Sequence, residues 1–184
     1  MSSNKRHTPN VNDVRPHEQT AVLTTLAQRT DAVGEAAREE IERLLTNVDP
    51  ESVAREVQFD FELIDADTIF ARSGRHRYGY TAPEEAAWQV LEETLEPYLE
   101  RMKWYHAAGR DEAFDAYALG VLRGLYDVHH DSEAEWKQPW PDNVREMFGW
   151  VLEAWEEHRQ GAAERQAMQD QLATSCPRWK RDLT

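Results

Sequence analysis

The sequence contains few of the residues and motifs that identify an enzyme. Cys176 is the only cysteine in 184 residues, so the chain has no intramolecular disulfide. It also contains no Gly-rich phosphate loop, no HExxH or CxxC metal motif and no GxSxG nucleophile elbow. We therefore assign no catalytic residue and no cofactor, and the sequence favours a protein that is not an enzyme.

Long apolar segments are also missing. A membrane-spanning helix needs about 18 or more consecutive apolar residues, and no such run occurs in the chain. The first 20 residues are polar and lack the apolar segment of a signal peptide. From the sequence we expect a cytoplasmic protein that does not associate with membranes.

Positive charge is scarce as well. The chain has 21 Lys and Arg residues against 35 Asp and Glu residues, a formal net charge of −14, and only four of the cations are lysines. A nucleic-acid-binding protein needs a concentrated positive surface, so this charge argues against nucleic acid as the partner. An acidic, lysine-poor surface is typical of proteins that stay soluble at high salt, and equally of ordinary acidic proteins from arginine-rich genomes. Both explanations remain open.

Apolar and aromatic residues are plentiful enough for a folded core. Hydrophobic residues make up 40% of the chain and include seven tryptophans. The pattern predicts a mainly α fold of the α+β class, with three or four helices packed around a central buried helix and a small antiparallel β-hairpin. We expect a disordered arm over residues 1–17, one mainly helical domain over 18–160, and a polar helical extension with a loose tail over 161–184.

The predicted central helix covers residues 111–128. Its residues are apolar or small on nearly every side, which is typical of a helix that is buried by several neighbours. Ala116, Gly120 and Gly124 recur at intervals of four, although glycine costs about 1 kcal/mol against alanine inside a helix. This row predicts the closest helix crossing in the fold.

The predicted β-hairpin covers residues 56–71. Val57, Phe59, Phe61 and Leu63 alternate there with polar residues. A period of two is typical of a half-buried strand, so we predict strands in this segment in preference to a helix.

A first candidate site combines histidines and carboxylates near the end of the central helix. Imidazole and carboxylate together suit zinc, nickel or iron. The candidate metal ligands are Asp127, His129, His130, Asp131 and His106. The alternative is structural: the two adjacent histidines bond the last carbonyls of the helix while Asp131 caps the next turn.

A second candidate is a basic cluster in an otherwise acidic chain. Guanidinium groups bind phosphate and carboxylate through paired hydrogen bonds, and aromatic rings stack on them. The candidate anion-binding residues are Arg72, Arg75, His76, Arg77 and Tyr78. The alternative is that these arginines pair with the protein's own carboxylates along the edge of the hairpin.

A third candidate is a group of tryptophans that could anchor a protein partner, because tryptophan is enriched at binding hot spots. Trp136, Trp140 and Trp150 are the candidates for this surface, whereas Trp155 falls on the inner side of its helix. Since tryptophan also fills cores, we expect at least two of these four side chains to be buried.

These features favour a non-enzymatic protein-interaction or adaptor domain that self-associates as a homo-oligomer. Two alternatives from other classes remain open. One is a metal-dependent enzyme that uses Asp127 and His130. The other is a regulatory module that binds an anionic ligand through Arg72, Arg75 and Arg77.

Overall fold

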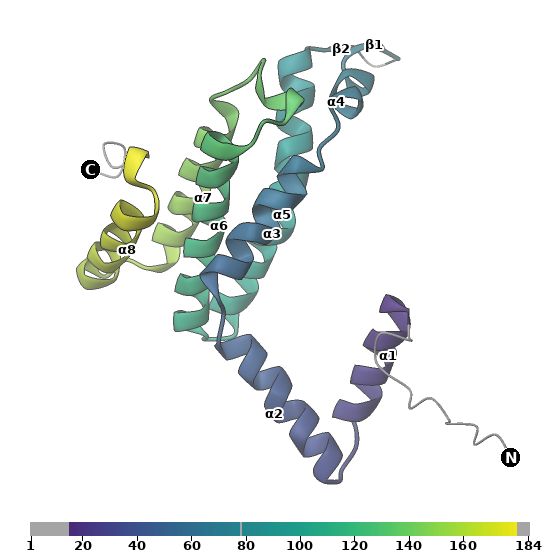
Figure 1. The fold of residues 1–184 in the computed structure, drawn as a ribbon, viewed down its shortest axis with the longest axis vertical. Helices are drawn as coiled ribbons and strands as arrows, with labels where there is room; N and C mark the ends of the chain where they lie inside the picture. The colour runs from purple at the N-terminus through teal and green to yellow at the C-terminus, as the bar shows by residue number, and fades with distance from the viewer. Residues whose placement is uncertain (1–14, 78, 180–184) are drawn as a thin grey trace, which may run out of the picture. The chain divides into compact units, whose positions relative to one another are not determined.

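The fold is mainly helical with one small antiparallel sheet, as the sequence predicts. A computed structural model describes residues 15–77 and 79–179, and these residues form eight α-helices and a two-stranded sheet (Figure 1). The contacts divide the chain into two units, residues 1–47 and residues 48–184. The predicted domain boundaries at residues 17 and 160 do not coincide with this division.

The first unit contains α1 (Pro16–Ala27) and α2 (Ala32–Thr46). Arg38 joins them, because its Nη1 donates to the carbonyl oxygens of Ala27 and Arg29 at 2.7 and 2.9 Å. Among residues 15 and 18–47, Gly34 alone is buried, so the described part of this unit has no apolar core of its own. The predicted disordered arm lies outside the described residues, except for its last three positions, where α1 begins.

The second unit contains the remaining elements. In chain order they are α3 (Pro50–Glu62), α4 (Ala66–Arg72), β1 (Gly74–His76), β2 (Gly79–Thr81), α5 (Pro83–Ala107), α6 (Asp111–Asp131), the 3₁₀-helix η2 (Glu135–Lys137), α7 (Asn143–His158), α8 (Ala162–Ser175) and the 3₁₀-helix η3 (Pro177–Trp179). Helix α6 packs against α3, α5, α7 and α8. Figure 1 shows α3, α5, α6 and α7 running side by side.

The glycine row of α6 marks a close helix crossing, as predicted. A Cβ atom on Gly120 would lie 2.6 Å from the Cβ of Val53, and one on Gly124 would lie 2.6 Å from the Cβ of Val57. Both valines belong to α3. The absence of a side chain at these two positions therefore allows α3 and α6 to approach each other.

The prediction of a β-hairpin over residues 56–71 is wrong, because residues 56–62 belong to α3 and residues 66–71 belong to α4. Asp49 caps α3 by accepting hydrogen bonds from the backbone N–H groups of Glu51 and Ser52. Phe61 is fully buried, whereas Phe59 is 60% exposed and Leu63 is 64% exposed. Apolar residues thus occupy two sides of one helix, and this produces the alternation that resembles a strand.

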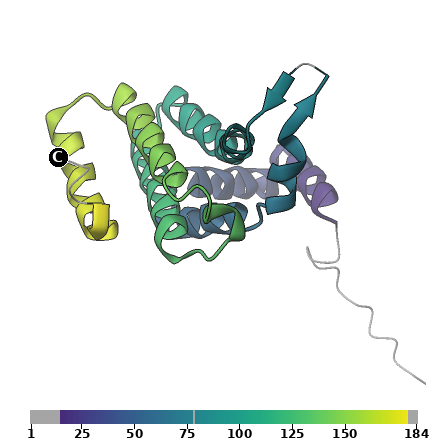
Figure 2. The same ribbon diagram turned by 90° about the horizontal axis from the view of Figure 1, so that it is seen from above.

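The actual hairpin follows α4 and consists of β1 and β2. Its register pairs Gly74 with Thr81, Arg75 with Tyr80 and His76 with Gly79. Figure 2 shows that the hairpin projects away from the helices.

The helix expected within residues 161–184 is present as α8, but the described part of this segment is neither a solvated extension nor a loose tail. Met168, Leu172, Cys176 and Trp179 are buried. The Trp179 ring packs edge-on against Phe148 with a centroid distance of 4.7 Å. The segment that contains α8 and η3 therefore contributes to the core. Residues 180–184 lie outside the described residues.

No helix in residues 15–77 and 79–179 has both the length and the apolar character needed to cross a lipid bilayer.

Candidate functional site

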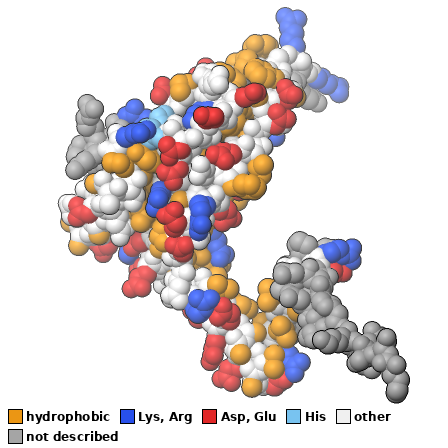
Figure 3. Space-filling view, in the orientation of Figure 1, with side chains coloured by type: hydrophobic (Ala, Val, Ile, Leu, Met, Phe, Trp, Pro, Cys, Tyr) orange, Lys and Arg blue, Asp and Glu red, His pale blue; other side chains and the backbone are white. Residues whose placement is uncertain are grey.

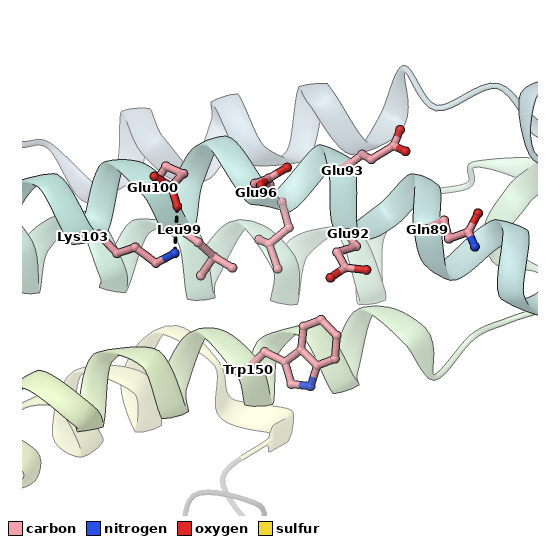
Figure 4. Close-up of a pocket in the computed structure, with 9 residues that line it drawn as sticks. Gln89, Glu92, Glu93, Glu96, Leu99, Glu100, Lys103 and Trp150 are labelled. Atoms are coloured by element: carbon pink, nitrogen blue, oxygen red, sulfur yellow. Dashed lines mark hydrogen bonds and ion pairs between the residues drawn. The ribbon is translucent and has the colours of Figure 1, made fainter.

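A groove of about 410 Å³ lies between α5 and α7 (Figure 4). Its lining residues are Gln89, Glu92, Glu93, Leu95, Glu96, Leu99, Glu100, Lys103 and Trp150. All of them except Trp150 come from α5. The groove thus combines apolar side chains with four carboxylates and a single lysine.

The groove-facing residues of α5 form a stripe along one side of the helix. Glu92, Glu96 and Lys103 follow one another at spacings of four and seven, which place them on the same side of a helix. A different side of α5 carries the buried Leu91 and Met102. Helix α5 therefore contributes one side to the core and another to the groove.

Trp150 is the apolar anchor that α7 contributes. Its side chain is 39% exposed, and Figure 4 shows the ring between α7 and α5, on the side of Glu92. The ring packs edge-on against half-buried Trp88, with centroids 4.8 Å apart and an interplanar angle of 83°. Such aromatic pairs contribute about 0.5–1.5 kcal/mol beyond the burial of area, so Trp88 holds the exposed ring in a fixed orientation.

The carboxylates of the groove differ in their partners. Glu93 accepts two hydrogen bonds of 2.7 Å from Arg72, and Glu100 pairs with Lys103 at 2.8 Å. Within the described residues, Glu92 and Glu96 form no ion pair. The four carboxylates thus outnumber the two cations that pair with them, Arg72 and Lys103. The rim therefore keeps a net negative charge that a cationic ligand can approach.

The predicted metal ligands are not brought together. His106 stacks on His158 with a centroid distance of 4.0 Å and packs near Phe114, at the start of α6. Asp127 lies near the other end of α6 and faces Arg123 at 3.7 Å. In the parts of the chain that the structure describes, no group of three or more His, Cys, Asp and Glu residues could hold a metal ion.

The structural alternative for the two adjacent histidines is wrong in both of its parts. Lys137 bonds the last carbonyls of α6, because its Nζ donates to the oxygens of Val128 and His129 at 3.0 and 3.1 Å. The rings of His129 and His130 instead lie against Trp179, at centroid distances of 5.0 and 5.5 Å. Exposed Asp131 is the last residue of α6 and does not cap the next turn.

Burial lowers the pKa of both histidines below the ordinary value of 6.5, and the cation of Lys137 adds to the shift at His129. The unfolded chain binds protons near pH 6.5, whereas the folded chain holds the rings neutral. The unfolded state therefore binds more protons, and the free energy of unfolding falls as the pH decreases below 6.5.

We expect the melting temperature to decrease between about pH 7 and pH 5, the range in which ordinary histidines titrate. Replacing both residues with phenylalanine keeps aromatic rings against Trp179 and removes the titration, so the decrease should become shallower. Thermal melts of both proteins across this range measure the effect. An equal decrease in the double variant would show that other groups cause it.

The basic cluster is only partly available to a ligand. Arg72 is committed to Glu93, as the alternative for this cluster predicts. Arg75 and Arg77 are exposed, on β1 and at the turn. Tyr78 and the side chain of His76 lie outside what the structure describes.

The three candidate tryptophans have different environments. Trp136 is 1% exposed, so its assignment to an interaction surface is wrong, because it fills the core beside Phe61. Trp140 is half-buried and packs near Phe70 at 6.3 Å. Only Trp150 of the three is exposed and lines the groove. Trp155 is buried, so two of the four tryptophans lie in the core, as expected.

The single cysteine is buried as well. Burial raises the pKa of the Cys176 thiol to about 12, with a further contribution from Asp127. The thiol is therefore protonated at neutral pH and does not serve as a nucleophile.

Comparison of the chain with protein-family models, curated proteins and solved structures gave no significant match.

Proposed function

We propose that the protein is a protein-interaction domain whose α5–α7 groove binds a basic segment with a large apolar anchor. In this proposal α3, α5, α6 and α7 act as one helical bundle that holds the two sides of the groove at a fixed spacing. One observation carries the proposal: the exposed ring of Trp150 packs against Trp88 and lies in a groove that is also lined by carboxylates.

The chemistry of the groove selects the charge of the ligand. Glu92 and Glu96 lie beside the apolar surface of Leu99 and Trp150. Complementary charge increases the rate of association and excludes partners of the same sign. Lysine or arginine side chains can pair with the rim while an apolar side chain packs on Trp150, whereas an acidic or phosphorylated ligand is repelled.

The residue types also suit a protein partner. Tryptophan is one of the residues enriched at the few positions that supply most of the binding energy of an interface. The volume of about 410 Å³ accommodates one or two large side chains. Neither the metal-enzyme alternative nor the anion-binding alternative has a comparable assembled site among the described residues.

The test is the binding of a fluorescein-labelled 15-residue peptide of leucine and lysine, patterned as an amphipathic helix. We expect Trp150→Ala to weaken its binding at least about tenfold, which corresponds to 1.4 kcal/mol. Fluorescence anisotropy at low salt measures the affinity. A leucine–glutamate peptide of the same pattern should not bind.

Trp104→Ala is the matched control for this test. Trp104 is 40% exposed, almost the same as Trp150, and it does not line the groove. The pair Glu92→Gln and Glu96→Gln should also weaken binding and reduce its dependence on salt. Failure of the leucine–lysine peptide to bind, or an equal loss in the two tryptophan variants, would overturn the proposal.

A further inference from the structure

The chain carries a projecting segment whose chemistry complements its own groove. We propose that the β1–β2 hairpin of a second copy occupies the α5–α7 groove, so that the protein assembles head to tail. This inference rests on the proposed function, because it names the partner for the same groove.

The hairpin has the required charge. Residues 72–81 contain three arginines and one histidine and no acidic residue, in a chain with a net charge of −14. Arg75 and Arg77 are exposed, and Figure 3 shows Lys and Arg side chains gathered at the end of the molecule where the hairpin lies. Arginine pairs with carboxylates through two parallel hydrogen bonds, and Glu92 and Glu96 offer such carboxylates.

The hairpin also has an apolar anchor. Tyr80 is 66% exposed, and it stands directly opposite Arg75 in the register of the two strands. Cross-strand partners in an antiparallel pair lie close together on the same side of the sheet. One side of the hairpin therefore presents a ring and a guanidinium together, the combination that a groove with Trp150 and a carboxylate rim can bind.

The arrangement of the two surfaces favours a second copy over the chain's own groove. The hairpin immediately precedes α5, which begins at Pro83, and projects away from the helices (Figure 2). The groove runs along α5 from Gln89 to Lys103. Arg72, at the base of the hairpin, is held on Glu93 of the same chain, and this contact fixes where the hairpin begins.

Contact between two different surfaces is heterologous, so each added copy leaves one free groove and one free hairpin. Such contacts produce rings or open chains in place of closed dimers. An eight- to ten-residue hairpin buries less than the roughly 800 Å² per partner of a standard interface. We therefore expect weak assembly that depends on protein concentration and is lost at high salt.

Sedimentation velocity of the full chain tests the assembly. The average mass should rise beyond that of a dimer with increasing protein concentration at low salt, and should return to that of a monomer at high salt. Tyr80→Ala, which leaves the charges unchanged, should weaken self-association at least about tenfold. A chain that is monomeric at every concentration at low salt would overturn the proposal.

A charge exchange identifies the two surfaces. Arg75→Glu with Arg77→Glu makes the hairpin acidic, and Glu92→Lys with Glu96→Lys makes the groove basic. Each double variant alone should be monomeric, because its hairpin and groove then carry charges of the same sign. An equimolar mixture should assemble again, because every hairpin then meets a groove of opposite charge.

The control is Glu35→Lys with Glu39→Lys, which reverses two exposed carboxylates on α2 without changing the groove or the hairpin. This variant should assemble like the original chain. Thermal melts of all variants verify that they are folded. Unchanged assembly of either charge-reversed variant alone, or no assembly of the mixture of folded variants, would overturn the proposal.

The leucine–lysine peptide separates this inference from the proposed function. The acidic-hairpin variant keeps an intact groove, so it should bind the peptide as a monomer. If the original chain binds the peptide in its groove and remains monomeric, the groove has another partner and only the head-to-tail assembly is wrong. If the peptide does not bind either, both proposals are wrong.

Discussion

Replacing Trp136 with alanine is expected to lower the free energy of unfolding by about 4 kcal/mol, because truncating a buried tryptophan costs about 3–5 kcal/mol. The side chain is 1% exposed and lies against Phe61 at the end of α3. Its Nε1 also donates a hydrogen bond of 3.0 Å to the Phe61 carbonyl oxygen. The substitution therefore removes a large apolar group and a link between the α6–α7 connection and α3.

Urea denaturation followed by circular dichroism measures this loss, and the melting temperature should decrease by about 10 °C. Trp136→Phe is the closest control. It keeps most of the ring and loses the hydrogen bond, which contributes about 1 kcal/mol. A change of less than 1 kcal/mol in the alanine variant would contradict the core position of this residue.

Trp150→Ala should show the opposite pattern. Its ring is 39% exposed and its main contact is Trp88. We expect a smaller stability loss than for Trp136→Ala, because part of the Trp150 ring is already in contact with water, together with the loss of peptide binding. Comparing the two tryptophan variants thus separates a core residue from a binding residue.

The second large effect is expected from Gly120→Ala in α6. Alanine favours a helix over glycine by about 1 kcal/mol, so the substitution would stabilise an isolated helix. In the fold, the new Cβ would lie 2.6 Å from the Cβ of Val53 and 2.7 Å from the carbonyl oxygen of Pro50. Separating α3 from α6 should cost more than the helix gains, and we expect a net loss of about 2 kcal/mol.

Gly149→Ala in α7 is the matched control, because a Cβ at that position has no neighbour within 4 Å. This variant should gain up to about 1 kcal/mol from helix propensity. Chemical denaturation of the two variants under the same conditions compares them directly. A Gly120 variant that is stabilised like the Gly149 variant would show that α3 and α6 are not in close contact.

Local patterns were sufficient for much of the helical fold. The all-round apolar composition of residues 111–128 identified a buried helix, and many residues of α6 are buried in the fold. This signal depends only on residues that are neighbours in the chain. Burial of a helix on several sides is set by its own composition, so it can be predicted from sequence.

The prediction of a strand where α3 lies failed for a definite physical reason. Val57 and Phe61 face the core, while Phe59 and Leu63 are exposed on another side of the same helix. A periodicity argument assumes that apolar residues mark one buried side. Here two sides are apolar, and the pattern of a helix with two apolar sides imitates the period of a strand.

The prediction of a solvated C-terminal segment failed for a different reason. Residues 162–175 contain few apolar residues, so their composition suggested a solvated helix. Met168 and Leu172 are nevertheless buried, and Trp179 completes an aromatic cluster with Tyr126 and Phe148. A few apolar side chains were enough to dock the segment, because the surface that receives them is made by distant parts of the chain.

The sequence by itself determined the helical composition, the strong negative charge, the basic segment at residues 72–81 and the glycine row of α6. Only the tertiary structure decided which tryptophan is exposed and which carboxylates lie beside it. The reason is that helical periodicity places residues on sides of one helix, whereas a groove needs a second helix opposite. Trp150 and Glu96 are 54 positions apart in the chain and line one groove because α5 and α7 pack around α6.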